Sequence, residues 1–260
     1  MSYQNLILNK EGFIATVTVN REKALNALNV DVLKEIHDCF SALSKDTEVR
    51  VVIVTGAGDK AFVAGADIAS MSQMTPTDAI EFGKLGHAAM DAVDQCAKPV
   101  IAAVNGFCLG GGMELALSCD FIYASEKAKL GLPEVNLGLF PGWGGTQRLS
   151  RLVGKGRAKE MIFSAKIISV QEAFDAGIVN KICKPEELLN EVKAVAAEIC
   201  KKSPMAVQLA KKTLSQGFDL PLAQGLDLEK NTFPKCFETE DLKEGLAAFL
   251  EKRPANFNGK

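Results

Sequence analysis

Two glutamates in this chain stand at points where the backbone around them looks closely specified. Glu114 follows three glycines in the stretch GGGMEL at residues 110–115, and Glu134 follows Pro133 in LPE. A pair of carboxyl groups placed in this way could serve general acid–base catalysis. Each residue also has an ordinary interpretation, because Glu114 would complement a helix dipole and Glu134 would be an exposed loop acid.

A second stretch of small residues could supply main-chain hydrogen-bond donors to the same reaction. FVAGAD, at residues 62–67, ends an apolar strand in small residues followed by an acid. Small residues let a ligand approach the main chain, so that N–H groups do the binding. If the amide of Ala66 and an amide of the glycine run pointed at one oxygen, they would form an oxyanion hole for an enolate. The alternative is that both turns serve only to reverse the chain.

Several familiar catalytic motifs are missing from the sequence. Residues 110–112 lack the Lys-Ser/Thr of a phosphate-binding loop, and GWGGTQ at 142–147 lacks the third glycine of a dinucleotide fingerprint. Two histidines, His37 and His87, leave no H-E-x-x-H pair, and there is no G-x-S-x-G elbow. The sequence therefore disfavours nucleotide hydrolysis and hydride transfer, and we expect no metal site.

The composition indicates a globular protein that acts on a small molecule. Of its 260 residues, 47% are hydrophobic and 24% charged, and the net charge of -2 comes without a long block of one sign. This disfavours a nucleic-acid or membrane surface. Seven cysteines without a C-x-x-C spacing predict neither a disulfide framework nor a zinc ribbon, and the N-terminal stretch lacks the pattern of a secretory signal. We therefore expect a cytoplasmic protein.

The elements that must position these residues alternate along the first two thirds of the chain. A helix that begins after Asn29, which can cap it, presents one apolar stripe, and two more helices are expected at 77–95 and 113–118. The pattern is strand, strand, helix, repeated without a fixed sequence period. Strands are predicted at 13–19, 51–56, 99–104, 120–124 and 128–132.

Beyond Leu149 the chain is predicted to be mostly helical. Ser169 and Glu172 form a capping-box pattern, and Gly177 follows the helix that they open. From about residue 200 there is no strand signal, so this part is expected to be a packing or assembly lobe. Helices are predicted at 156–163, 170–176, 186–201, 204–216 and 239–250.

Taken together, these stretches resemble the crotonase superfamily and, within it, the enoyl-CoA hydratases. The resemblance implies an α/β fold, a ClpP-like spiral of β-β-α units over residues 1–199, followed by a helical trimerisation region at 200–260. It also implies a trimer or a dimer of trimers. The stretches that carry it are NREKALNAL (20–28), FVAGADI (62–68), KPVIAAVNGFCLGGGMELALSCD (98–120), LPEVNLGLFPGWGGTQRL (132–149) and FLEKRPANF (249–257).

The resemblance implies a hydro-lyase that adds water to a trans-2-enoyl-CoA. The backbone amides of Ala66 and Gly111 would grip the thioester carbonyl, Glu114 would help to deprotonate the water, and Glu134 would deliver a proton to Cα. No cofactor is expected, because coenzyme A is part of the substrate. The residues implied in binding the acyl-CoA are Lys23, Ala24, Leu25, Ala27, Ala64, Asp67 and Ile68, with Lys252 of a neighbouring subunit near the phosphates.

Other reactions on the same fold remain alternatives, since fold membership does not fix chemistry. An enoyl-CoA isomerase, a 3-methylglutaconyl-CoA hydratase, a hydrolase or a decarboxylase would share it, and so would a non-catalytic scaffold. The presence of both glutamates favours hydration. Leu132 and Met113 stand where glutamine and cysteine are common in short-chain hydratases, and Trp143 is either a core residue or part of the acyl pocket.

Overall fold

The larger of two sheets is built mainly from buried parallel strands. In the computed structural model, which describes residues 3–260, its strand order is β1-β2-β3-β5-β7-β10, with β1 and β2 antiparallel and each later pair parallel. Buried parallel strands read as continuous apolar runs, as VVIVTG does in β3. The bounds are β1 Leu6–Glu11, β2 Ile14–Val19, β3 Val51–Gly56, β5 Val100–Val104, β7 Phe121–Ser125 and β10 Lys181–Cys183.

The strand that follows each of β3, β5 and β7 along the chain lies in the smaller sheet. Its order is β4-β6-β8-β9, with β4, β6 and β8 parallel and β9 antiparallel to β8. The chain therefore passes through one sheet, then the other, then into a helix, which confirms the predicted β-β-α spiral. The bounds are β4 Ala61–Val63, β6 Phe107–Leu109, β8 Lys129–Gly131 and β9 Ile167–Ser169.

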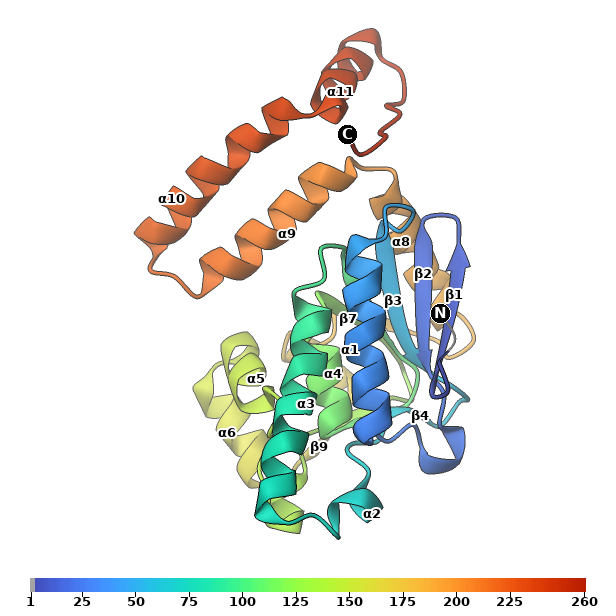
Figure 1. Ribbon diagram of the computed structural model, residues 1–260, viewed down its shortest axis with the longest axis vertical. Helices are drawn as coiled ribbons and strands as arrows, with labels where there is room; N and C mark the ends of the chain where they lie inside the picture. The colour runs from blue at the N-terminus through green and yellow to red at the C-terminus, as the bar shows by residue number, and fades with distance from the viewer. Residues whose placement is uncertain (1–2) are drawn as a thin grey trace.

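Helices cover both faces of the larger sheet (Figure 1). Val52 and Val54 of β3 face the core beneath α1 and α3, while Ile53 faces α8, because successive side chains of a strand point to opposite faces. Asn29 caps α1 as predicted by accepting a hydrogen bond from the Val32 N–H. The core helices are α1 Val30–Lys45, α2 Ile68–Met71, α3 Pro76–Asp94, α4 Gly111–Leu117, α5 Gly145–Val153, α6 Lys155–Phe163, α7 Val170–Asp175 and α8 Leu188–Cys200, with short 3-10 helices η1 Glu22–Ala24 and η2 Glu134–Leu137.

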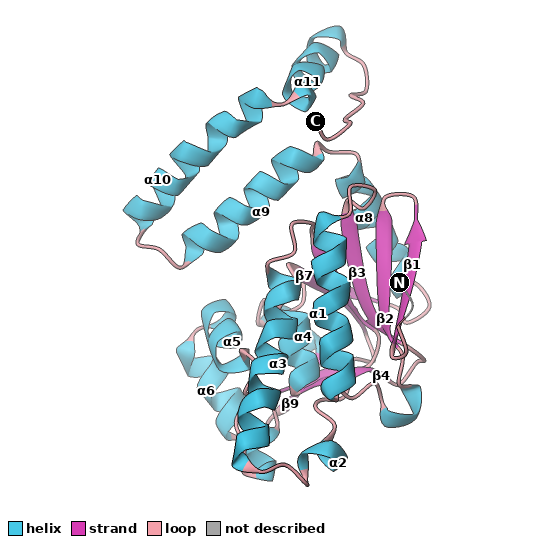
Figure 2. Ribbon diagram, viewed as in Figure 1, coloured by secondary structure: helices cyan, strands magenta, loops and turns pink. Residues whose placement is uncertain are grey.

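The last helices project from the sheets as a separate lobe (Figure 2). Lys211 of α9 fastens the lobe to the core, since its Nζ donates to Asp120 Oδ2 at 2.8 Å and to the Lys98 carbonyl at 3.0 Å. Large apolar side chains such as Leu214 and Phe249 remain exposed on the lobe. Its elements are α9 Pro204–Phe218, α10 Leu222–Thr232, η3 Phe233–Glu238 and α11 Glu240–Glu251.

Most predicted elements are confirmed to within two residues, and the differences have local reasons. The helix expected at 113–118 begins at Gly111, because glycine's low helix propensity is overridden by tight packing of this turn. Strands β6, β9 and β10 were missed, since three residues are too few to show a periodicity. The longer elements β1, α5 and α10 were missed as well. The expected domain boundary at residue 200 falls at the end of α8 and stays a prediction.

Asn26 joins the connection after β2 to the two strands beside it. It is fully buried in the left-handed conformation (φ 60°), which asparagine adopts more readily than most residues. Its side-chain amide donates to the carbonyls of Ala57 and Ala61 at 2.9 and 2.8 Å and accepts from the Arg21 N–H at 3.0 Å. This residue therefore fixes the segment that follows it against β4.

Substituting Asn26→Ala should lower the free energy of unfolding by about 2–4 kcal/mol. The cost combines buried polar groups that lose a partner with a left-handed backbone that alanine disfavours. Urea unfolding at neutral pH measures the change. The control is Asn9→Ala, because Asn9 makes only a surface hydrogen bond to Glu11 and should change stability by less than about 0.5 kcal/mol. Equal effects of the two substitutions would contradict the role of Asn26.

Candidate active site

The predicted site residues follow the ends of three neighbouring parallel strands. Ala66 comes shortly after β4, Gly111 after β6 and Glu134 after β8. Ligands bind beyond the carboxyl ends of parallel strands, where the outgoing loops meet. Contact between the loops is direct, since the Gly110 N–H donates to the Gly131 carbonyl at 2.9 Å. The small sheet thus brings together residues that are far apart in sequence.

The three glycines are needed because other groups approach the backbone closely. A Cβ on Gly112 would lie 2.0 Å from the Val63 carbonyl oxygen, and one on Gly111 would lie 2.6 Å from Cζ3 of Trp143. Gly110 has φ +51°, and a Cβ there would lie 3.2 Å from Oε1 of Glu134. A turn that served only to reverse the chain would not need every one of these three positions to lack a Cβ. The alternative of simple glycine turns therefore does not account for this segment.

Two backbone amides meet at the glycine run. The point where a Gly111 Cβ would lie is 3.6 Å from the Ala66 nitrogen. Gly111 is the first residue of α4, so its N–H is not used within the helix. Within residues 3–260, no hydrogen bond of either amide N–H is observed. Both N–H groups are therefore free of protein partners, which is one condition for an oxyanion hole, and the oxyanion hole itself stays a prediction.

Glu114 is a buried acid held by two main-chain donors. Only 2% of the residue is exposed, and its Oε1 accepts from the N–H groups of Trp143 at 2.7 Å and Gly145 at 2.8 Å. Burial raises the pKa of this carboxyl, while the two amide hydrogen bonds act in the opposite direction by favouring the charged form. These donors fix the carboxyl group in one orientation.

Glu134 is a partly buried acid, and the main-chain hydrogen bond that lowers its pKa comes from its own residue. Its Oε2 is buried and has no hydrogen-bond partner among the described residues. The pKa of Glu134 is raised to about 7, mainly by burial and in smaller part by the nearby negative charge of Glu114, while a hydrogen bond from its own main chain acts in the opposite direction. Two neighbouring carboxyls thus differ in environment, so near neutral pH Glu134 holds a proton more readily and Glu114 is better suited to be ionised.

Arg148 positions the loop that binds Glu114, and sequence reasoning missed it. Its guanidinium donates to the Trp143 carbonyl and to Asp91 and Asp94 of α3, each at 3.2 Å. The loop that carries the two Glu114 donors is thereby fastened to α3. In the sequence, Arg148 stands out only as an arginine near the start of the helix after the glycine-rich loop. Its partners on α3, Asp91 and Asp94, lie more than 50 residues away, so no local pattern links them to it.

The segments expected to bind coenzyme A lie side by side. The Ala64 N–H donates to the Leu25 carbonyl at 3.1 Å. Leu28, which follows Ala27, pairs with Ala66 in a parallel bridge. Asp67 caps α2 and pairs with Arg21, another residue that sequence reasoning missed, at 3.0 Å. Lys23 and Ile68 are exposed, and Ala24 ends η1.

Lys252 lies in the C-terminal lobe, apart from the other predicted site residues. It lies at the C-terminal end of α11, and Figure 1 shows α11 at the opposite end of the molecule from α2 and β4. A single chain does not bring this lysine to the carboxyl pair. Its role through a neighbouring subunit stays a prediction.

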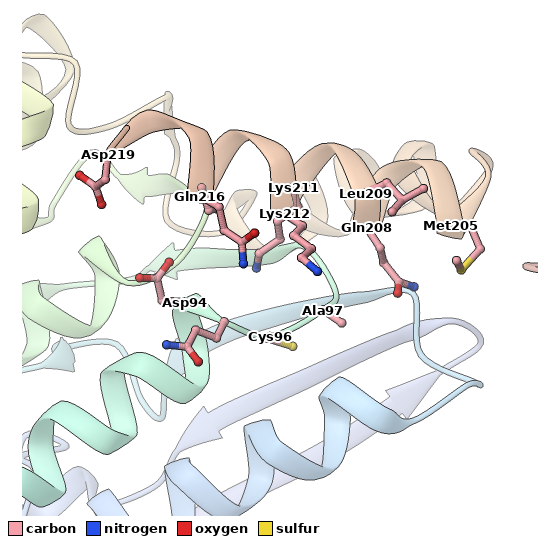
Figure 3. A pocket seen from close by; sticks show the side chains of 12 residues that line it. Asp94, Cys96, Ala97, Met205, Gln208, Leu209, Lys211, Lys212, Gln216 and Asp219 are labelled. Carbon is pink, nitrogen blue, oxygen red and sulfur yellow. The ribbon is translucent and has the colours of Figure 1, made fainter. Parts of the chain in front are cut away.

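A separate cleft of about 690 Å³ lies where the lobe joins the core (Figure 3). Side chains of α9, including Lys212 and Gln216, face the turn from Asp94 to Ala97. None of its lining residues belongs to the pair of acids or the pair of amides. We therefore assign the chemistry to the strand ends and not to this cleft.

The described residues 3–260 contain no cluster of three or more His, Cys, Asp or Glu side chains that could hold a metal ion. Within the same part of the chain, no helix is both long enough and apolar enough to cross a membrane. The seven cysteines are free thiols. Trp143, Leu132 and Met113 are buried in the main core cluster.

Comparisons with known proteins find relatives along nearly the whole chain. The sequence profile of the family described as "Enoyl-CoA hydratase/isomerase" matches residues 9–260. The chain is 51% identical to the crotonyl-CoA hydratase of Syntrophomonas wolfei over the whole of both chains. It is 50% identical to the short-chain-enoyl-CoA hydratase of Clostridium acetobutylicum, covering 97% of each. The crystal structure of an enoyl-CoA hydratase from Bacillus anthracis superposes with a TM-score of 0.97 at 40% identity, covering 99% of this chain and 100% of that one.

The raised pKa of Glu134 predicts a pH-dependent effect of Glu134→Gln on stability. A carboxyl whose folded-state pKa lies near 7, above its ordinary 4.5, makes the folded protein lose stability as pH rises from about 4.5 to 7. Glutamine removes this penalty. The variant should therefore be more stable than the parent at pH 8 by roughly 1–2 kcal/mol, a value reduced from the full shift because the carboxyl is partly solvated.

Urea unfolding at pH 5 and pH 8 measures this difference. Near pH 5 the two proteins should have nearly equal stability. Glu126→Gln is the matched control, because Glu126 is exposed and the substitution should have little effect at either pH. A Glu134→Gln variant that is less stable than the parent at pH 8 would contradict the burial effect.

Proposed function

We propose that this chain, which belongs to the enoyl-CoA hydratase/isomerase family of the crotonase superfamily, adds water reversibly to a trans-2-enoyl-CoA and forms a 3-hydroxyacyl-CoA. The observation that carries the proposal is the pair of acids with opposed environments beside a pair of backbone amides. Glu114 accepts two main-chain hydrogen bonds, whereas Glu134 has a buried oxygen without a partner among the described residues. Relatives with half of their residues identical are named as hydratases, which supports the same reaction.

In the proposed mechanism, the amides of Ala66 and Gly111 bind the thioester oxygen. Addition at Cβ moves negative charge onto this oxygen, and donors that are already in place stabilise the enolate. A water held between the two carboxyls loses a proton to Glu114 as its oxygen bonds to Cβ. Glu134 then gives its proton to Cα. Both new bonds form on the side of the double bond that faces the water, so the addition is syn.

Glu134 is suited to be the acid because of its raised pKa. An acid works best when its pKa lies near the working pH, and burial raises that of Glu134 to about 7. Glu114 begins ionised and ends protonated, and exchange of protons between the two carboxyls through the next water restores the starting state. No cofactor is needed for these steps, and coenzyme A is part of the substrate.

Two other functions remain candidates on this fold. An isomerase that moves the double bond can work with one acid, so the presence of both glutamates favours hydration over isomerisation. A non-catalytic scaffold would not need the two buried carboxyls, whose burial is costly to the folded state. Neither alternative is favoured by a specific observation.

Glu114→Gln and Glu134→Gln should each lower kcat for crotonyl-CoA hydration by roughly 10²-fold or more. Glutamine keeps the shape of each side chain but does not exchange protons. Loss of enoyl thioester absorbance measures the rate, and Glu126→Gln serves as the control with parental activity. Turnover near the parental rate in either test variant would contradict its assignment.

We also propose that the protein is a trimer or a dimer of trimers in the cytoplasm. Leu214, Leu222 and Phe249 are among the large apolar side chains that stay exposed on the C-terminal lobe, and such surface on a single chain favours association. Seven free cysteines suit a reducing compartment. Lys252 of a neighbouring subunit would lie near the phosphates of coenzyme A.

Light scattering after size-exclusion chromatography should give three or six times the mass of one chain. Leu222→Asp should shift the population toward smaller species, because it places a charge in an apolar contact. Lys34→Asp, a change at an exposed position of α1 in the core, is the control. A parent protein that elutes as a monomer at micromolar concentration would contradict the proposed assembly.

A further inference from the structure

Two hydrogen-bonded peptide groups stand behind the Ala66 N–H. In a planar trans peptide the carbonyl and the N–H point in opposite directions. The peptide between Gly65 and Ala66 therefore presents the Ala66 N–H on one side and the Gly65 carbonyl on the other. That carbonyl accepts from the Leu28 N–H at 2.9 Å. The contact with Leu28 thus sets the direction of the Ala66 N–H.

The same arrangement repeats in the second peptide, between Ala27 and Leu28. It presents the Leu28 N–H on one side and the Ala27 carbonyl on the other. The Ala27 carbonyl accepts from Nη1 of Arg21 at 2.6 Å. These two peptides, which we call the peptide row, connect the guanidinium of Arg21 to the Ala66 N–H through two hydrogen bonds.

Arg21 gives the peptide row a charged end. Hydrogen bonds from an ionised donor are stronger than those between neutral groups, and hydrogen bonds in a chain polarise one another. Both N–H groups of the row point away from the guanidinium, so the two peptide dipoles are directed the same way. The positive charge of Arg21 therefore makes the Ala66 N–H a stronger donor.

The second arm of the guanidinium holds the peptide row in place. Nη2 of Arg21 donates to Asp67 Oδ2 at 3.0 Å, and these two side chains are only 20% and 18% exposed. Asp67 is itself fixed, because its Oδ1 accepts from the Ser70 N–H and its main-chain N–H donates to the Leu28 carbonyl. The planar guanidinium thus bridges the two chain segments that form the row.

The two amides of the expected oxyanion hole differ in what stands behind them. Gly111 is the first residue of α4, so the aligned peptides of a helix follow its N–H. Ala66 belongs to an isolated bridge with Leu28 and not to a helix. The peptide row supplies aligned peptides for this second amide, and Arg21 supplies their charge.

We propose that Arg21 is a positioning residue for the hydration, which orients and polarises the Ala66 N–H through the peptide row. The inference rests on the proposed function, because it assumes that the thioester oxygen binds at the amides of Ala66 and Gly111. The effect is larger for the enolate than for the substrate, because the enolate oxygen carries more negative charge. Arg21 therefore acts on kcat more than on substrate binding.

Arg21→Met should lower kcat for crotonyl-CoA by roughly 10-fold or more, which is less than the 10²- to 10³-fold cost of removing an oxyanion donor. The Ala66 amide remains in this variant but loses its orientation and its polarisation. KM should change by less than about threefold, because contacts made equally to substrate and transition state stay. Arg21→Lys keeps the charge without the two-armed geometry and should recover part of the loss.

Infrared difference spectra of bound butyryl-CoA, labelled with ¹³C at the carbonyl, give a readout that a merely structural role would not move. In the parent the carbonyl stretch should lie below its frequency in water. In Arg21→Met it should return part of the way toward that frequency. Lower stability or weaker binding changes the amount of bound ligand but not the frequency of the ligand that is bound.

Arg50→Met is the matched control. Arg50 also donates to two main-chain carbonyls, those of Cys200 and Phe257, each at 2.8 Å, but it precedes β3, whereas Ala66 follows β4. This variant should lose stability and keep the parental kcat and carbonyl frequency. If Arg21→Met does not fold, Arg21→Lys and Asp67→Asn decide the question, because each weakens the grip on the guanidinium and should shift the frequency toward that in water.

An active parent whose Arg21 variants keep the parental carbonyl frequency would overturn the inference and leave hydration intact, whether or not kcat falls. A parent that hydrates no enoyl-CoA, but binds butyryl-CoA with a lowered frequency that the Arg21 variants restore, would refute the proposed reaction and support the role of Arg21. A parent that binds butyryl-CoA with its frequency in water would refute both the oxyanion hole and the inference.

Discussion

The site depends on the close approach of a bare backbone to the end of a neighbouring strand. Gly112 packs so tightly on the Val63 carbonyl that a Cβ would lie 2.0 Å from it. This contact packs the start of α4 against the end of β4, and the Ala66 nitrogen lies 3.6 Å from the point where a Gly111 Cβ would be. Main-chain donors held in this way need no reorganisation when charge develops, which is why such groups are effective in a buried site.

The same contact decides how the acids are placed. Once α4 begins at Gly111, Glu114 falls within its first turn and reaches the amides of the loop that Arg148 fastens to α3. Glu134 follows the adjacent strand β8, and its Oε2 is buried without a hydrogen-bond partner among the described residues. Burial raises the pKa of both carboxyls, but two amide hydrogen bonds oppose this effect at Glu114, so Glu134 is the one better suited to hold a proton.

Much of this arrangement could be predicted from local patterns in the sequence. Apolar runs and turn signals gave the alternating strands and helices, and two glycine-rich stretches followed by acids indicated both halves of the site. What could not be predicted depends on contacts between distant residues. Arg148 reaches α3, Asn26 binds the connection between β3 and β4 and the first residue of β4, and Trp143 fits against Gly86 of α3. Neither hydrophobic periodicity nor the spacing of motifs contains information about such long-range contacts. The resemblance to a family points only to the residues that this chain shares with its relatives.

The central claim is that the amides of Ala66 and Gly111 polarise one thioester carbonyl. The most direct measurement is isotope-edited infrared difference spectroscopy of butyryl-CoA labelled with ¹³C at the carbonyl, a saturated ligand that cannot be hydrated. Two short hydrogen bonds to the oxygen weaken the C=O bond, so the bound carbonyl stretch should lie at clearly lower frequency than in water. A bound ligand with the frequency that it has in water would contradict the proposed oxyanion hole.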